Sequence, residues 1–414
     1  MATFSNVSVI GLGYIGLPTA AVIASRGISV VGVDVSQEAV DIINQGKIHI
    51  VEPDLDMVVQ AAVTTGKLKA TLTPEPADAF MIAVPTPFKD QHKPDLSYIE
   101  SAAKAIAPVL EKGNLIVLES TSPVGATEQL AAWLKDLRPD LLSPLDDSEH
   151  QDLFIAHCPE RVLPGRVLEE LVSNDRVIGG LSEKCAAKAL ALYQTFVRGN
   201  CIVTNARTAE MAKLTENSFR DVNIAFANEL SIICDQLKIN VWELIALANR
   251  HPRVNILSPG PGVGGHCIAV DPWFIVDAAP EAARIIRTAR EVNDGKPHYV
   301  VDQVVQKADQ LKQPVVACLG LSFKADIDDL RESPAVEIAL DLIDKNIGEI
   351  LLVEPNIHQL PPKFADKNAQ LVGLQEALDK ANVVVVLVDH KAFKNIPKST
   401  LNQKIVIDTR GVFM

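Results

Sequence analysis

A glycine-rich segment with a single cysteine, GPGVGGHCIAVDP (260–272), is the part of this sequence best suited to covalent chemistry. Cysteine is usually a buried, unreactive residue in soluble proteins, so its place among so many glycines needs a reason. A thiolate is a strong nucleophile, and a cationic or helix-N-terminal setting favours it over the thiol. We therefore predict that Cys267 is a catalytic nucleophile and that Asp271 takes part in proton transfer.

Two other roles remain open for this segment. In the first, Cys267 is a packed core thiol. In the second, His266, Cys267 and Asp271 bind a metal ion, but their spacing matches no common zinc pattern and adjacent residues rarely both reach one ion. We therefore predict no metal site, and we interpret the glycines as leaving room for a sugar to approach the backbone.

A polar stripe on a long helical segment could bind the substrate. Within AEMAKLTENSFRDVNIAFANEL (209–230), Lys213, Asn217 and Arg220 stand at positions i, i+4 and i+7 and so share one helix face. A lysine, an amide and an arginine together suit an anionic ligand rich in hydroxyl groups. The alternative is an ordinary solvated stripe, but the apolar remainder of the helix favours the binding role.

A dinucleotide-binding signature opens the chain. GLGYIG (11–16) follows an apolar strand-like run, opens a helical segment, and precedes Asp34 at the end of the next run. In such a motif Gly11 permits a tight turn, Gly13 lets a pyrophosphate approach the backbone, and Gly16 lets the helix pack closely on the strand. An acidic residue at the end of the second strand binds ribose hydroxyls, so Asp34 favours NAD over NADP.

Polar residues also follow the later apolar runs. Thr86 lies near the end of AFMIAVPTP (79–87), and Thr121 lies near the end of GNLIVLESTSP (113–123). Glu160 lies in DLFIAHCPERVLPG (152–165). Short apolar runs of this kind are typical of buried parallel strands, whose carboxyl ends carry the functional loops. Thr86 and Thr121 are therefore expected beside the nicotinamide, and Glu160 is a candidate to direct a hydrolytic water.

The elements that must position these residues form three regions. Strand-like and helical runs alternate over residues 1–204, residues 205–305 are mainly helical, and the alternation returns over 306–414. The predicted fold is α/β, with two Rossmann-like doubly wound domains joined by a central helical domain.

Composition narrows the functional classes. A net charge of −13 argues against nucleic-acid binding, which needs a basic face. Four breaks, Gly11, Gly13, Gly16 and Pro18, interrupt the uncharged N-terminal stretch, so we expect no signal peptide and no membrane span. The six cysteines are scattered and show no CxxC, which is typical of reduced thiols in the cytoplasm.

Six segments in order along the chain carry a family resemblance. GLGYIGLP, STSPVGAT, CPERVLPG, AEMAKLTENSFRDVNIAFANEL, GPGVGGHCIAVDP and GLSFKADIDDLRESPA together resemble the UDP-glucose/GDP-mannose dehydrogenase family. The resemblance implies an NAD-dependent, four-electron oxidation of the C6 alcohol of a UDP-sugar to a uronic acid. It also implies an NAD-binding first domain, a dimerising middle and a UDP-binding last domain.

The resemblance assigns roles to individual residues. It implies catalytic roles for Cys267, Lys213, Asn217, Asp271, Glu160 and Thr121. It implies cofactor contacts for Gly11, Gly13, Tyr14, Ile15, Gly16, Asp34, Thr86, Thr127 and Arg331. It implies substrate contacts for Arg161, Val162, Lys213, Asn217, Arg220, His251, Arg253, Gly264, Phe323 and Lys324. The stretch 250–253 would come from the other subunit of a homodimer with shared active sites.

Substrate identity is less specific. The segment ANRHPRVNILSPGPGVGGHCIAVDPWF (248–274) is most like the branch of the family that acts on UDP-N-acetyl-D-mannosamine. UDP-N-acetylglucosamine or UDP-glucose is the alternative within the class. A one-step β-hydroxyacid dehydrogenase would need neither the cysteine segment nor a third domain, and a non-enzymatic sensor would not need Lys213, Asn217, Cys267 and Asp271 together.

Overall fold

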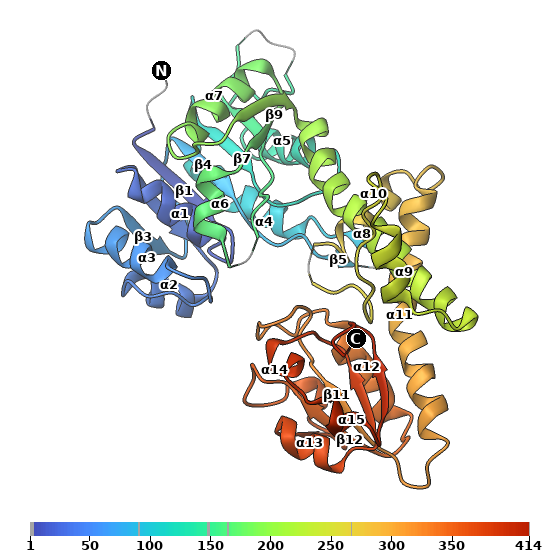
Figure 1. Cartoon of the computed structure of the whole chain (residues 1–414). Helices are drawn as coiled ribbons and strands as arrows, with labels where there is room; N and C mark the ends of the chain where they lie inside the picture. Colours follow the sequence, from blue (N-terminus) through green and yellow to red (C-terminus); the bar gives the residue numbers. More distant parts are fainter. Residues whose placement is uncertain (1–3, 90–91, 147–149, 164, 266, 414) are drawn as a thin grey trace. The chain divides into compact units, whose positions relative to one another are not determined.

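A computed structural model describes residues 4–89, 92–146, 150–163, 165–265 and 267–413. The chain divides into two units, residues 1–216 and 217–414. The long helix α8 (Ala206–Leu237) runs from the first unit into the second (Figure 1).

The first unit is built on an eight-stranded sheet in the order β10-β9-β8-β7-β4-β1-β2-β3. From β3 to β8 the strands are parallel, which is the strand order of a dinucleotide-binding fold, and β9 pairs antiparallel with β8. The strands are β1 (Asn6–Ile10), β2 (Ser29–Val33), β3 (Leu68–Thr71), β4 (Ala79–Ile82), β7 (Leu115–Leu118), β8 (Phe154–His157), β9 (Arg176–Gly180) and β10 (Cys201–Asn205). A separate hairpin joins β5 (Phe88–Lys89) to β6 (Lys93–Pro94).

The central strands of this sheet are buried on both faces, since alternate residues point to opposite sides and helices cover each side. In β4, Ala79 and Met81 pack into one core, while Phe80 and Ile82 pack into the other. The first core is covered by α1 (Gly16–Ser25), α2 (Gln37–Asn44), α3 (Leu55–Thr64), α6 (Val167–Ser173) and α7 (Glu183–Tyr193). The second is covered by α4 (Ser97–Ile106) and α5 (Ala126–Leu137).

The second unit begins with helices. After α8 come α9 (Val241–Ala248), α10 (Asp271–Ala278) and α11 (Arg284–Ala308), and between α9 and α10 the described chain forms turns and extended segments. A buried ion pair joins α11 to α8, with Arg290 Nη1 lying 2.6 Å from Asp221 Oδ1. Since an unpaired charge is costly in a protein interior, this contact helps to set how the two helices pack.

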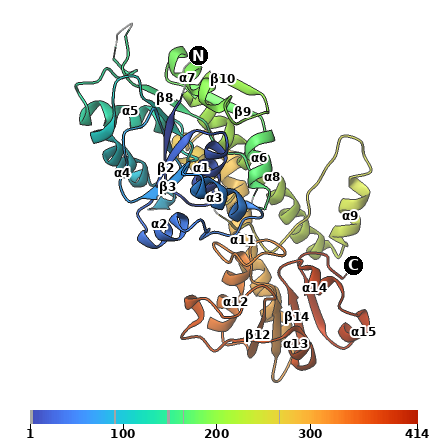
Figure 2. The same ribbon diagram turned by 90° about the vertical axis from the view of Figure 1, so that its left-hand side faces the viewer.

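A five-stranded parallel sheet ends the second unit, in the order β13-β12-β11-β14-β15. Its strands are β11 (Val315–Leu319), β12 (Glu349–Val353), β13 (Gln370–Leu371), β14 (Val383–Val386) and β15 (Ile405–Asp408). One face packs on α11 and α12 (Pro334–Asp344), and the other on α13 (Leu374–Lys380), α14 (Lys391–Lys394) and α15 (Lys398–Leu401). Figure 2 shows α12 on one side of this sheet and α14 and α15 on the other.

The predicted α/β architecture, with two Rossmann-like domains and a helical middle, is confirmed. The strands are shorter than the apolar runs that predicted them. AFMIAVPTP, for example, gives a strand only over Ala79–Ile82, because its later residues form the loop at the carboxyl end of the strand.

Candidate active site

The turn between β1 and α1 has the geometry of a dinucleotide-binding loop. Gly11 has φ +90° and donates its N–H to Val33 O at 2.8 Å. A Cβ atom at Gly16 would lie 1.8 Å from Gly11 O, so the chain's own packing requires glycine there. Beside Gly13 there is nothing within 4 Å of an added Cβ, which leaves its backbone open to a ligand. These features fit a bound pyrophosphate.

Asp34 lies directly after β2 and holds this turn. Its Oδ2 accepts the Leu12 N–H at 2.9 Å and its Oδ1 accepts the Ser36 N–H at 2.9 Å. The side chain is half-buried, so its remaining lone pairs can reach a ligand. The turn and the carboxylate together fit the phosphate and ribose groups of NAD.

The carboxyl ends of β4 and β7 meet at the same edge of the sheet. The Thr86 hydroxyl donates to Thr121 O, which joins the two predicted nicotinamide-side residues. Thr127, in the first turn of α5, donates both its N–H and its hydroxyl to Glu210 Oε1, at 2.8 and 2.6 Å. Glu210 is buried on α8 and caps α5, so it orients Thr127.

Glu160 is a buried carboxylate with an arginine partner. Its Oε2 lies 2.5 Å from Arg176 Nη1, and its Oε1 accepts the Arg161 N–H at 2.6 Å. Burial, followed by the nearby charge of Glu160, raises the pKa of Glu119 to about 8. Glu119 and Glu160 are thus two buried carboxyl groups close enough to interact through their charges.

Cys267 is exposed and lies one turn before α10. Its carbonyl oxygen accepts the N–H groups of Val270 and Asp271 at 3.1 and 2.9 Å, so the cysteine is tied to the start of that helix. The predicted partner Asp271 is buried, and Asn217 Nδ2 donates to its Oδ2 at 2.5 Å. Asn217 and Asp271, predicted separately from a helix face and from the glycine segment, are therefore in contact.

Helix α8 holds this segment at both ends. Asn217 binds Asp271, and Asn228 Oδ1 accepts the Gly260 N–H at 2.8 Å. Because the two asparagines are eleven residues apart, close to three helical turns, both project from one face of α8. Asn228 is itself oriented by Asn293, which accepts its Nδ2–H at 2.8 Å. Gly260 and Asp271 are thus each held by an asparagine of α8.

The glycines of the segment also lie close to other parts of the chain. Beside Gly264, an added Cβ would lie 2.3 Å from Glu332 O and 2.7 Å from Pro334 Cδ. Gly265 has φ +85° and faces the Phe323 ring. The loop between β11 and α12 occupies the space that a Cβ atom would need, so these glycines permit close packing of the chain on itself.

The other predicted site residues occupy separate positions. Lys213 is half-buried and Arg220 exposed on α8, where they share a face with Asn217, and Arg161 forms an ion pair with Glu216 at 2.7 Å. Arg331 is exposed and lies 2.6 Å from Asp329. The remaining predicted residues are exposed or half-buried in loops: Tyr14, Ile15, Val162, His251, Arg253, Phe323 and Lys324. His266 lies outside the described residues.

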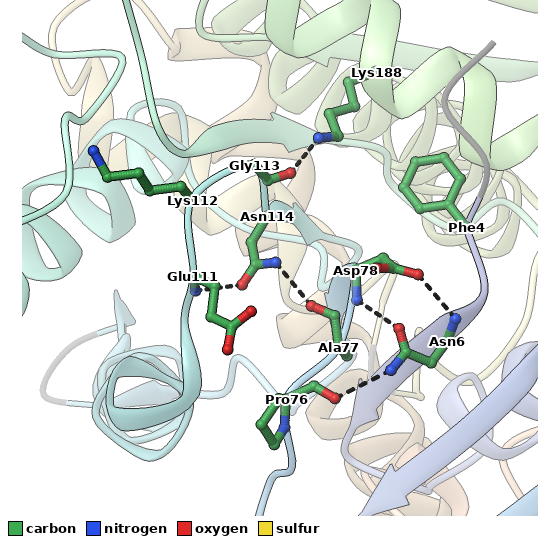
Figure 3. A pocket seen from close by; sticks show the side chains of 10 residues that line it. All are labelled: Phe4, Asn6, Pro76, Ala77, Asp78, Glu111, Lys112, Gly113, Asn114 and Lys188. Atoms are coloured by element: carbon green, nitrogen blue, oxygen red, sulfur yellow. Dashed lines mark hydrogen bonds between the residues drawn. The ribbon is translucent and has the colours of Figure 1, made fainter.

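A polar pocket of about 260 Å³ lies at the amino ends of β1, β4 and β7, shown in Figure 3. Its polar groups bind one another, since Asn114 Nδ2 donates to Ala77 O at 2.8 Å and Asp78 N–H donates to Asn6 Oδ1 at 2.9 Å. Ligands of open α/β sheets bind at the carboxyl ends of the strands. We therefore assign this pocket a structural role.

Three residues of the site have no sequence signal that would have identified them. Arg176, Glu210 and Asn228 act through contacts 16, 83 and 32 positions away in the chain. Asn228, in the stretch IAFANEL (224–230), at least has apolar neighbours, whereas Glu210 lies among polar and charged residues. No helix among the described residues is long and apolar enough to cross a membrane.

The dinucleotide turn of the first unit fits a nicotinamide cofactor, and the exposed Cys267 of the second unit could serve as a nucleophile, so the class that these features favour is a nicotinamide-dependent oxidoreductase. Residues 5–197 match the NAD binding domain of the UDP-glucose/GDP-mannose dehydrogenase family, 207–295 its central domain and 317–414 its UDP binding domain. The chain belongs to this family. It is an NAD-dependent UDP-sugar dehydrogenase.

Individual relatives agree with this assignment. The chain is 66% identical over 410 residues to an NDP-N-acetyl-D-galactosaminuronic acid dehydrogenase of Ralstonia nicotianae, covering 99% of this chain and 96% of that one. It is 66% identical over 395 residues to a UDP-N-acetyl-D-mannosamine dehydrogenase of Campylobacter jejuni, covering 95% and 97%. The solved UDP-D-ManNAc dehydrogenase of Pyrococcus horikoshii superposes with a TM-score of 0.88 at 39% identity, covering 99% and 96%.

The packing of the glycine segment gives a direct test. Gly264→Ala places a methyl group against the backbone oxygen of Glu332 and the ring of Pro334, an overlap that no rotamer change can relieve. We expect kcat/KM to fall by about 10²-fold, because a displacement of an ångström at a catalytic group has that cost. The measurement is steady-state kinetics with a thermal unfolding control.

Gly295→Ala is the matched control. Gly295 lies within α11, and nothing lies within 4 Å of an added Cβ. This variant should keep wild-type kcat/KM and gain up to about 1 kcal/mol of stability from the helix propensity of alanine. Wild-type kinetics in Gly264→Ala would show that the close packing does not position the cysteine.

Proposed function

We propose that this enzyme oxidises the C6 alcohol of UDP-N-acetyl-D-mannosamine to UDP-N-acetyl-D-mannosaminuronate, a precursor for cell-surface polysaccharide. The observation that carries the proposal is the exposed Cys267 tied to the start of α10, with the Asn217–Asp271 contact beside it. A simple alcohol dehydrogenase has no use for a nucleophile, whereas a four-electron oxidation to an acid requires one.

Cys267 makes the second oxidation possible. The alcohol first loses a hydride and a proton to give an aldehyde, which is a poor hydride donor. The Cys267 thiolate then adds to C6, and the new C–S bond gives a thiohemiacetal whose C–H can leave as a second hydride. The product is a thioester, and water cleaves its C–S bond to release the carboxylate and restore the thiol. NAD, when bound, accepts one hydride in each oxidation.

The polar groups of the site divide the proton transfers. Asp271 is buried and held by Asn217, so it can exchange a proton without changing position. Lys213 is the candidate to take the alcohol proton and to stabilise the oxygen of the intermediates. Glu160, fixed by Arg176 on one oxygen, is the candidate to direct the hydrolytic water. Thr121 is the candidate to orient these groups at the nicotinamide side.

The choice of sugar rests on the relatives. UDP-N-acetyl-D-mannosamine dehydrogenases of Campylobacter jejuni, Salmonella typhi and Escherichia coli are 66%, 62% and 61% identical to this chain. The Ralstonia proteins at 65–66% are named for a galactosaminuronic acid derivative, so an epimer is the alternative. Initial rates with the UDP derivatives of ManNAc, GlcNAc, GalNAc and glucose separate these candidates. A higher kcat/KM for any sugar other than ManNAc contradicts the proposed substrate.

Replacement of the nucleophile tests the mechanism. In Cys267→Ser we expect acid formation to fall at least about 10³-fold, because a serine hydroxyl is a far weaker nucleophile than a thiolate. Binding of the UDP-sugar, measured by calorimetry, should remain within a few-fold of the wild type, since the cysteine takes no part in holding the nucleotide.

Cys201→Ser provides the matched control for this experiment. Cys201 is half-buried at the start of β10, and its replacement should leave the rate unchanged. If Cys267→Ser forms the acid at the wild-type rate, Cys267 is not the nucleophile.

We further propose that the enzyme is a homodimer with shared active sites, formed along α8. Phe219, Phe226 and Leu237 are 72%, 51% and 63% exposed. Their separations of seven and eleven residues place them on one face of the helix. A continuous exposed apolar stripe of this kind is typical of a protein interface. In such a dimer the exposed His251 and Arg253 would serve the partner's substrate.

Charge placed on the stripe should separate the subunits. The double variant Phe219→Glu, Phe226→Glu should change the mass in light scattering from two chains to one chain of 44.7 kDa, because carboxylates cannot be buried unpaired. Met57→Glu, at an exposed apolar residue on α3, is the control and should remain dimeric. A monomeric wild-type protein would refute the interface.

A further inference from the structure

Three hydrogen bonds donated by backbone N–H groups stabilise the turn after β1. Gly11 N–H donates to Val33 O at 2.8 Å, which joins the turn to the end of β2. The carboxylate of Asp34 then accepts the Leu12 N–H through one oxygen and the Ser36 N–H through the other, both at 2.9 Å. This is the position from which a dinucleotide-binding domain reads a ribose.

The same three contacts recur after β11 in the second unit. Gly320, with φ +95°, donates its N–H to Val353 O at 2.8 Å. The carboxylate of Glu354, directly after β12, accepts the Leu321 N–H at 2.8 Å through one oxygen and the Asn356 N–H at 3.1 Å through the other. Glu354 is therefore the counterpart of Asp34. The five strands of its sheet, β13-β12-β11-β14-β15, follow the same order as β3-β2-β1-β4-β7 of the first unit.

The two carboxylates differ in what they face. Asp34 is half-buried, and its remaining lone pairs are accessible. Glu354 is 4% exposed, and His390, itself 1% exposed, lies 3.0 Å from its Oε2. Burial would raise the pKa of Glu354, but hydrogen bonds from His390 and the Leu321 N–H outweigh it and hold that pKa below its usual value. The group is a carboxylate satisfied from within the protein.

His390 also fixes the loop that follows β11. Its Nδ1 accepts the Asp326 N–H at 2.9 Å, so the neutral ring carries its proton on Nε2 and donates it to Glu354. Ser322 Oγ lies 3.3 Å from the same Nε2. Contacts with Glu354 and His390 thus hold the loop at Leu321, Ser322 and Asp326. This loop, residues 321–331, contains the predicted nucleotide contacts Phe323 and Lys324.

We propose that the His390–Glu354 pair fills the ribose-reading position of the C-terminal sheet, so that this domain rejects NAD and its loop is shaped for a mononucleotide. His390 is then a positioning residue that determines nucleotide specificity. His390 donates to Glu354 the hydrogen bond that a ribose hydroxyl would donate to Asp34. The inference rests on the proposed function only in taking the UDP of the substrate as the ligand of this domain.

Binding measurements test the proposal without turnover. Calorimetry of the full-length wild-type enzyme should give one NAD per chain, with an affinity that saturating UDP does not reduce by competition. A second NAD per chain that UDP displaces would overturn the proposal, and this arm needs no variant. Because the readout is binding, loss of oxidation with an unchanged binding pattern would refute the proposed function and leave this inference standing.

Variants of the histidine test its positioning role. His390→Ala should weaken UDP binding about tenfold, since it leaves the buried Glu354 carboxylate short of a donor. The affinity of the N-terminal domain for NAD should stay at the wild-type value. His390→Gln, which keeps a donor near Nε2, should recover most of the UDP affinity. His358→Ala, at an exposed histidine of the same domain, should bind both ligands normally.

Two results with these variants would contradict the proposal. The first is wild-type UDP affinity in His390→Ala. The second is a glutamine variant that binds UDP no better than the alanine variant, because the donor to Glu354 would then not be what the histidine supplies. Near-ultraviolet circular dichroism checks that each variant keeps its tertiary structure, and a variant that has lost it is judged by the wild-type stoichiometry instead.

Discussion

The arrangement of the segment that carries Cys267 depends on one close contact between two stretches of backbone. At Gly264 the chain passes so close to residues 332–334 that even a methyl group would overlap Glu332 O. Peptide units can approach this closely only where there is no side chain. The segment carrying Cys267 thereby packs against the loop between β11 and α12. The same loop contains the predicted nucleotide contacts Phe323 and Lys324.

Buried amides and charges of the helical middle hold the other side of the segment. Asn228 binds the Gly260 N–H, Asn293 orients Asn228, and Asn293 in turn donates to Asp221, the partner of Arg290. Every link in this chain of contacts is buried. Buried polar groups are costly unless satisfied, so such a network favours a single arrangement of α8 and α11. The position of the segment is therefore determined by contacts to both the helices and the C-terminal sheet.

Local patterns made much of this fold and site predictable. Gly11, Gly13, Gly16 and Asp34 lie in one strand–turn–helix–strand unit, whose physical requirements are met by neighbouring residues. The face shared by Lys213, Asn217 and Arg220 follows from helical periodicity alone. The contact of Asn217 with Asp271 follows from no local pattern, because the two residues lie 54 positions apart and meet only in the folded chain.

Contacts made by the tertiary structure could not be predicted in this way. Arg176 and His390 are ordinary residues in their local sequence, and their roles arise because Glu160 and Glu354 are buried beside them. The glycines of residues 260–265 were recognised as special, but their close packing on residues 323–334 could not be foreseen. Sequence shows that a side chain is absent, whereas only the fold shows whether a ligand or the chain itself occupies the space.

In the proposed reaction, one cysteine carries the sugar through two oxidations. The most direct measurement is the number of NADH molecules formed per UDP-N-acetyl-D-mannosamine consumed, with the product identified by mass spectrometry. If Cys267 is the nucleophile of both oxidations, we expect two NADH per sugar and a uronic acid as the product. One NADH per sugar, with the free aldehyde as the end product, would contradict it.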